Sequence, residues 1–96
     1  MIYTVTWNPA AEADLTDLWL QAADRQIVTL AADHIESVLR INPYAHSEVL
    51  PPNKRLMQVG PLAVAYTVSD PDCLMTVWAV WRTDQPGVNN NGQNNG

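Results

Sequence analysis

The chain of 96 residues is long enough for one small domain and too short for two. Apolar residues make up 47% of it, which is enough for a packed core without support from a metal or a disulfide. The formal charge of −5, with only five Lys and Arg, argues against generic nucleic-acid binding, because such binding draws on clustered cations.

Cys73 is the only cysteine, so the chain cannot form an internal disulfide, and we interpret it as a small buried apolar residue. His34 and His46 have no carboxylate or cysteine at ligand spacing, so we expect no metal site, and no motif indicates a cofactor. No apolar run approaches the roughly 20 residues of a membrane helix, and the chain does not open with a secretion signal. The sequence therefore predicts a soluble protein of the reducing cytoplasm, without membrane contact.

A strand and two helices are predicted in the first half of the chain. The opening "MIYTVTW" alternates apolar and polar side chains, which is typical of a strand. Asn8 and Pro9 then supply a cap and a first residue for a helix over 9–22. Asp24 is the expected cap of a second helix over 24–41, which should end before "NP" at 42 and 43.

The second half of the chain predicts a loop, three strands and a tail. Residues 43–53, "PYAHSEVLPPN", contain three prolines and no period, which indicates a surface loop. The strands "KRLMQV", "LAVAYTVS" and "CLMTVWAVW" follow, separated by the turn signals "GP" and "DPD". The order β-α-α-β-β-β predicts an α+β domain over 1–84, in which a helical hairpin packs on a four-stranded, mostly antiparallel sheet with its first strand beside its last. The low-complexity run "QPGVNNNGQNNG" indicates a disordered tail over 85–96.

Three stretches resemble the RelE/ParE toxins of bacterial type II toxin–antitoxin modules, a group also described as plasmid stabilisation proteins. They are "YTVTWNPAAEADLTDLW", the "INP" that ends the second predicted helix, and "KRLMQVGPLAVAYTV…LMTVWAVWR". The resemblance spans residues 2–83 and implies a toxin that a cognate antitoxin protein neutralises. It also implies a target, which is the ribosome for RNA-cleaving members and DNA gyrase for ParE-like members.

The candidate catalytic residues are the cations Arg82, Arg55 and Lys54. Cleavage of RNA by its 2′-hydroxyl needs a base, an acid and cations that stabilise the phosphorane, and the resemblance places Arg82 at the border of the open sheet face where RNA-cleaving members work. Those members often carry an arginine in a G-x-x-R-x-x-Y run, where this chain has Ala63. They also carry a histidine where this chain has Trp81, and a tyrosine after the final arginine that is missing here.

These departures favour a toxin that acts by protein contact, directed at gyrase, over a ribosome-dependent mRNA endonuclease. The alternative is a catalytically silent member of the group that serves as a binding module for its antitoxin or for another protein.

Strand alternation assigns the side chains of the last strand to two faces. One face would carry Thr76, Trp78, Val80 and Arg82, and the other Cys73, Met75, Val77, Ala79 and Trp81. The second set is the more uniformly apolar, so we expect it to face the helices and Arg82 to lie on the open face beside Trp78. Trp78 and Tyr66 are the expected partner-contact residues, with core packing as the competing interpretation of both. Lys54 and Arg55 should point to opposite faces, and alternation alone does not tell which of them is on the open side.

Overall fold

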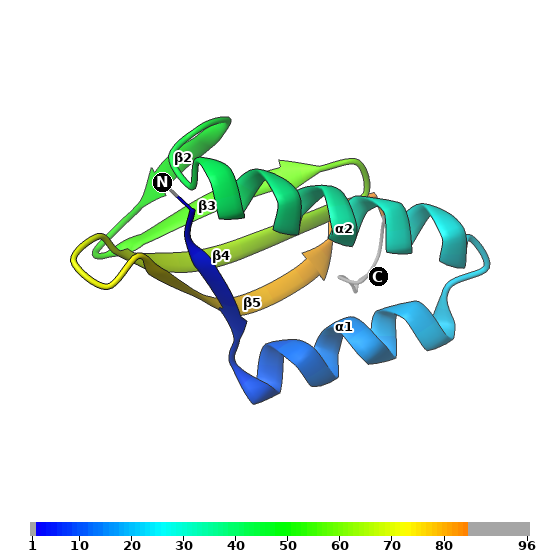
Figure 1. Ribbon diagram of the computed structural model, residues 1–96. Coiled ribbons are helices and arrows are strands. Elements are labelled where there is room, and N and C mark those ends of the chain that lie inside the picture. The colour runs from blue at the N-terminus through cyan, green and yellow to red at the C-terminus, as the bar shows by residue number, and fades with distance from the viewer. Residues whose placement is uncertain (1, 85–96) are drawn as a thin grey trace.

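The structure is a computed structural model that describes residues 2–84 and has an α+β architecture (Figure 1). Figure 1 shows the two helices on the same side of the sheet, with the first strand leading directly into the first helix. In chain order the elements are β1 (Thr4–Trp7), α1 (Pro9–Gln21), α2 (Arg25–Ile41), β2 (Ser47–Leu50), β3 (Lys54–Val59), β4 (Leu62–Ser69) and β5 (Leu74–Arg82). The predicted order of helices and strands is confirmed, with one strand added.

The sheet has five strands in the order β1-β5-β4-β3-β2, so the prediction of four strands is wrong by one. β1 is parallel to β5, as expected for a first strand beside the last, and the other neighbours are antiparallel. The added strand, β2, lies in the segment predicted as a loop and pairs with β3 from Ser47↔Met57 to Leu50↔Lys54. β2 is an edge strand, and its side chains are mostly exposed. Its sequence therefore lacks the alternation of apolar and polar residues from which a strand is predicted.

The N-terminal ends of the two helices use their predicted caps differently. Asn8 Oδ1 accepts a hydrogen bond from the backbone N–H of Ala10 at 2.9 Å, and Pro9 is the first residue of α1, as predicted. Asp24 precedes α2, but its side chain makes no capping hydrogen bond. Asp24 is the residue at the N-cap of α2, as predicted, but its carboxylate does not cap the helix, because that carboxylate binds an arginine of the sheet.

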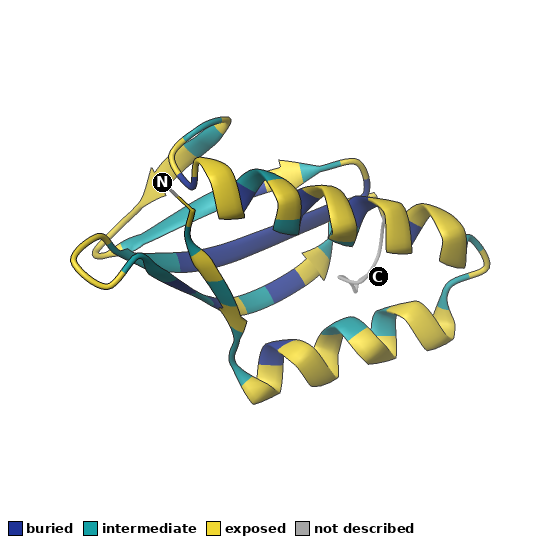
Figure 2. Cartoon of the chain, in the orientation of Figure 1, coloured by how far each residue is buried: buried dark blue, intermediate teal, exposed yellow. Residues whose placement is uncertain are grey.

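The core lies between the helices and one face of the sheet, which we call the covered face. Figure 2 shows that the buried positions concentrate on the strands behind the helices. α2 contributes four buried side chains at spacings of three and four, whereas α1 contributes only Ala11. Burial of each large aliphatic side chain stabilises the fold by about 1.5–3 kcal/mol. The buried cluster consists of Ala11, Val28, Ala31, Ile35, Leu39, Met57, Leu62, Val64, Tyr66, Met75, Val77 and Val80.

Two further predictions concern a membrane-spanning helix and the C-terminal tail. No helix within residues 2–84 is long and apolar enough to cross a membrane. The predicted tail over 85–96 lies outside the described residues.

Candidate functional site on the open sheet face

β5 contains a bulge at Trp78, and every residue of β5 after the bulge lies on the face opposite to the one that regular alternation predicts. Ala65 of β4 pairs with Ala79, whereas the next residue, Tyr66, pairs with Val77, so Trp78 is one extra residue in β5. Regular alternation holds up to Val77 and resumes in the opposite phase after the bulge. The side chains of Val80 and Arg82 therefore point to the covered face, and Trp81 points to the open face.

Burial agrees with this exchange of faces. Val77 and Val80 are both buried in the core, although they are three residues apart in a strand. Trp78 and Trp81 are 44% and 39% exposed, respectively. The expectation that Arg82 and Val80 lie on the open face, and that Ala79 and Trp81 face the helices, is wrong, because it assumed an unbroken period of two. Cys73, predicted as a buried residue of this strand, is half-buried in the turn before β5.

Arg82 is held by two carboxylates at the end of β5. Its Nη1 and Nη2 atoms donate to the two oxygens of Asp24 at 2.9 and 3.0 Å, and its Nε and Nη2 atoms donate to the two oxygens of Asp84, both at 2.9 Å. The side chain is only 8% exposed. The hydrogen bonds from Arg82 lower the pKa of both Asp24 and Asp84, and those same bonds raise the pKa of Arg82. Arg82 therefore links the sheet to the turn between the helices and is neutralised there.

The other two candidate cations lie on opposite faces, as predicted. Arg55 pairs with Tyr66 and so belongs to the covered face. Its Nε donates to Ser47 Oγ at 3.0 Å, and its guanidinium lies 5.1 Å from the centre of the Tyr44 ring. Lys54 pairs with Leu50 on the open face. The structure thus separates the three predicted catalytic residues and does not bring them together as one site.

The open face is a mostly uncharged surface that no helix of the described chain covers. Among its strand residues the charged ones are Lys54 and Glu48, and Glu48 pairs with Leu56. Trp78 Nε1 donates to Thr67 Oγ1 at 2.8 Å, which fixes the indole against β4. The pairing registers and strand alternation place on this face Thr4, Thr6, Glu48, Leu50, Lys54, Leu56, Gln58, Ala63, Ala65, Thr67, Ser69, Leu74, Thr76, Trp78, Ala79 and Trp81.

Tyr66 does not share this surface. Its side chain is fully buried on the covered face, and its hydroxyl donates to the backbone carbonyl of Pro43. Burial raises the pKa of the Tyr66 phenol. Tyr66 therefore presents no surface to a partner, and of the two expected contact residues only Trp78 is exposed. The sequence reading placed Trp81 in the core, although in the structure it is the second exposed aromatic on the open face.

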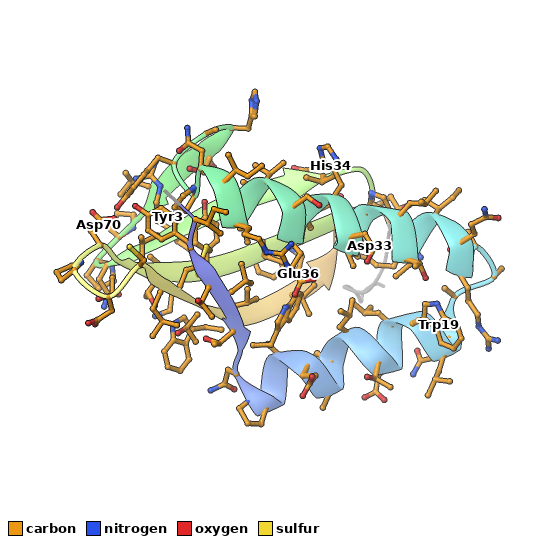
Figure 3. The ribbon with its side chains drawn as sticks, viewed as in Figure 1. Tyr3, Trp19, Asp33, His34, Glu36 and Asp70 are labelled. Atoms are coloured by element: carbon orange, nitrogen blue, oxygen red, sulfur yellow. The ribbon has the colours of Figure 1, made fainter. Side chains whose placement is uncertain are left out.

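A second polar cluster, which the sequence reading missed, lies at the turn between β4 and β5. Asp70 accepts hydrogen bonds from the hydroxyls of Tyr3 and Tyr44, each at 2.7 Å (Figure 3). These two bonds lower the pKa of Asp70, and the bond to Asp70 raises the pKa of Tyr3 to about 12. The three residues are far apart in the sequence, so only the fold could bring them together. The cluster joins the residue before β1, the turn after α2 and the β4–β5 turn.

A metal ion needs side chains that are grouped around it. Within residues 2–84, no three His, Cys, Asp or Glu side chains are placed so that they could hold one. The open face presents two exposed indoles, and its single Lys and single Glu are a sparse set for acid–base chemistry.

Comparison with solved structures shows the fold of RelE-like toxins. The toxin–antitoxin complex RelBE2 from Mycobacterium tuberculosis matches with a TM-score of 0.73 and 18% identity, over 85% of this chain and 99% of that one. A free double arginine-to-alanine mutant of Escherichia coli RelE matches with a TM-score of 0.62 and 14% identity, over 88% and 86%. The YoeB–YefM complex from Staphylococcus aureus matches with a TM-score of 0.54 and 15% identity, over 83% and 95%. No protein-family model and no curated protein matches the sequence. The α+β prediction and the RelE-like resemblance are confirmed at the level of the fold.

Proposed function

We propose that the chain is the toxin of a type II toxin–antitoxin module and that it acts through protein contact, with DNA gyrase as the target, and not through cleavage of RNA. The proposal depends on the open face. Trp78 and Trp81 are exposed there, and Lys54 is the one cation among the strand residues that point to that face. Exposed tryptophans on a rigid, weakly charged surface are typical of the centre of a protein interface.

The positions of the arginines argue against cleavage of RNA. Preorganised cations that stabilise a phosphorane are each worth on the order of 3 kcal/mol, and they must face the reacting phosphate. Arg82 is bound to Asp24 and Asp84, and Arg55 lies on the covered face beside Ser47. Arg25 donates to the carbonyls of Trp19 and Leu20, so it closes the C-terminal end of α1.

The proposed partners follow from the same fold. RelBE2 and YoeB–YefM are both complexes of a toxin with an antitoxin, so we propose a cognate antitoxin for this chain as well. A gyrase-directed toxin would act in the cytoplasm. The competing function is a catalytically silent member that only binds an antitoxin or another protein.

The test is induced expression in a bacterial host without antitoxin, with colony counts, primer extension on cellular mRNA and a supercoiling assay with purified gyrase. We expect growth arrest, intact mRNA and inhibited supercoiling. The double variant Trp78→Ala, Trp81→Ala should weaken the inhibition by at least about tenfold, because interface aromatics are worth 2 kcal/mol or more each. The control Lys54→Ala should inhibit like the wild type.

Three results would contradict the proposal in different ways. Cleaved mRNA that depends on Lys54 would establish RNA chemistry. Growth arrest with intact mRNA and normal supercoiling would indicate another protein target. A wild-type chain that does not slow growth, although circular dichroism shows it folded, would favour the silent binding module.

A further inference from the structure

The outward side of α2 carries apolar side chains that do not pack in the core. The buried residues of α2 are Val28, Ala31, Ile35 and Leu39. On another side of the same helix, Ile27, Leu30 and Ile41 are 52%, 60% and 70% exposed. Figure 2 shows that the outer surface of α2 is exposed along most of its length. A single exposed aliphatic residue needs no explanation, but three on one side of one helix indicate a contact surface.

These exposed residues follow the heptad spacing of a coiled coil. Successive positions are separated by three, four, three and four residues, so they form one stripe along the helix. The stripe is aliphatic towards both ends and polar in its middle. It consists of Ile27, Leu30, His34, Ser37 and Ile41, all of them exposed, and we call it the outer stripe. The pairing side of a helix in a two-stranded coiled coil has this spacing.

The outer stripe borders a shallow hollow on the flank of α2 that is turned away from α1. The hollow has a volume of about 410 Å³. Ile27, Leu30 and His34 line it from α2, and Val59 and Pro61 line it from the end of β3 and the turn that follows. Figure 3 shows that His34 points away from α1. The outer stripe is therefore a different surface from the space between the two helices.

The charges along one edge of the outer stripe are self-complementary. Asp33 and Arg40 lie seven residues apart and directly precede His34 and Ile41. Within residues 2–84, neither Asp33 nor Arg40 forms a salt bridge. If two copies of α2 pack antiparallel, Asp33 of each copy lies beside Arg40 of the other, because the flanking positions run in reverse order along the partner. In a parallel pair, Asp33 would lie opposite Val38 and would gain no charged partner.

We propose that a second copy of this chain binds the outer stripe, so that two α2 helices pack antiparallel about a two-fold axis. Leu30 of each copy then packs on the partner's Ile41, and Asp33 faces the partner's Arg40. Because the contact is isologous, each of these pairs forms twice. The stripe extends from Ile27 to Ile41, about 21 Å at 1.5 Å per residue. An interface of this length is small, so we expect a dissociation constant in the micromolar range.

The polar middle of the outer stripe selects the register of the pair. In the proposed register, His34 lies opposite the partner's Ser37, so polar side chains face each other at both central layers. A shift by one heptad towards the N-terminus would place the imidazole against the partner's Leu30 and leave Ile41 without a partner. Burial of a polar group against an aliphatic one costs free energy, so the shifted register is disfavoured.

The chain has no other segment suited to cover the outer stripe. Residues 85–96 contain no charged residue and only one aliphatic side chain, Val88, so their sequence complements neither Asp33 and Arg40 nor the exposed aliphatics. The outer stripe lies on the helix side of the sheet, and the open face lies on the other side. The inference therefore does not rest on the proposed function.

The first experiment measures the mass of the full chain by sedimentation equilibrium from micromolar to millimolar concentration. We expect an equilibrium between monomer and dimer. Leu30→Glu should abolish the dimer, because it places a carboxylate in an apolar layer at two symmetric positions. Leu20→Glu is the matched control, since it makes the same substitution at an exposed leucine of α1 outside the outer stripe. It should leave the dissociation constant unchanged within about twofold.

Charge reversal tests the antiparallel register. Asp33→Arg places an arginine beside the partner's Arg40, and Arg40→Asp places two carboxylates together. Each single variant should weaken the dimer at least about fivefold, because a favourable pair becomes a repulsive one at two positions. The double variant Asp33→Arg, Arg40→Asp restores both pairs and should bind within about twofold of the wild type. Asp14→Arg makes the same change of charge at an exposed position of α1 and is the control for net charge.

Any of four results would overturn the proposal. A wild-type chain that stays monomeric at every concentration would leave the outer stripe to a different partner. A dimer that survives Leu30→Glu, but is lost in Trp78→Ala, would place the interface on the open face. Equal weakening by Leu30→Glu and Leu20→Glu would indicate non-specific association, and a double charge variant no tighter than the single ones would contradict the antiparallel register. Circular dichroism melting of each variant separates loss of the dimer from loss of the fold.

Discussion

The two faces of the sheet differ in cover, in charge and in their use of tryptophan. On the covered face, apolar side chains from both helices and from β3, β4 and β5 are buried together, and Arg82 closes one end. The open face carries small and hydroxylated residues around Trp78 and Trp81, with one Lys and one Glu among its strand residues. Buried side chains thus lie on one face and the exposed indoles on the other, and the extra residue Trp78 determines which residues of β5 lie on each face.

Deletion of single residues from β5 should have the largest effect of any change discussed below. Without Val80, Trp81 would move to the covered face and Arg82 to the open face, away from Asp24. We expect a loss of more than about 4 kcal/mol and an unfolded chain. Deletion of Trp78 removes the bulge and keeps every other pairing, so it should cost only about 1–2 kcal/mol. Urea unfolding followed by circular dichroism distinguishes the two. If both deletions are equally damaging, the assigned register of β5 is wrong.

The second largest effect should be the difference in stability between substitutions of two adjacent residues that lie on opposite faces of the sheet. Met75 is buried on the covered face, and Met75→Ala should lower the free energy of unfolding by about 2–5 kcal/mol. Thr76→Ala, one residue further on the open face, should change it by less than about 1 kcal/mol, since it loses only an exposed contact with the Thr6 hydroxyl. Chemical denaturation of the two variants measures the difference. A similar loss in both would mean that the open face is also packed.

Removal of Arg82 tests the connection between sheet and helices. Arg82→Ala leaves Asp24 and Asp84 near each other without their cation, so we expect Tm to fall by about 4–8 °C, the shift produced by roughly 1 kcal/mol in a domain of this size. Arg82→Lys should recover only part of this, because an ammonium cannot donate in parallel to both carboxylates. Lys54→Ala on the open face is the control and should leave Tm unchanged. An unchanged Tm for Arg82→Ala would restore the view of Arg82 as a free functional cation.

The smallest expected effect is the pH dependence of stability, which reports on three individual Asp carboxylates. Asp24, Asp84 and Asp70 have lowered pKa values in the folded state, so their contribution is present above the unfolded Asp pKa of about 3.9 and is lost as the pH falls through the folded values. Arg82→Ala should reduce this loss, because it removes the cause of two of the three shifts. If the stability of Arg82→Ala falls with decreasing pH as steeply as that of the wild type, Arg82 is not the cause of the lowered pKa values of Asp24 and Asp84.

Tyr3 supplies the corresponding test at high pH. Its folded pKa is about 12 and its unfolded value is about 10, so its contribution is present below pH 10 and is lost between about pH 10 and 12. Tyr3→Phe should flatten the stability curve in this range, as measured by denaturation at each pH. If Tyr3→Phe leaves the curve as steep as in the wild type, the bond to Asp70 does not control this titration.

Local chemistry made much of the fold predictable. Asn8 and Pro9 start α1 because a side-chain acceptor and a fixed φ suit the first turn of a helix. The limits of β3 and β4 agree with the predicted "KRLMQV" and "LAVAYTVS", since turn residues on both sides interrupt the period. The position of Asp24 predicted the start of α2 correctly, but not the role of its side chain. Its carboxylate binds Arg82, which is distant in the sequence, so no local pattern around Asp24 indicates this contact.

The sequence by itself determined the order of all elements except β2, the helical period of α2, the pairing of β3, β4 and β5 as consecutive neighbours, and the shortage of cations, because these depend on residues close together in the chain. Only the tertiary structure decided which face each residue of β5 occupies, which carboxylates bind Arg82, and how Tyr3, Tyr44 and Asp70 come together. A bulge is defined by the partner strand and not by the residues that form it, so the sequence of β5 reads as an unbroken alternation. The physical reason is that side-chain direction in a strand depends on pairing, and pairing joins residues that are distant in the sequence.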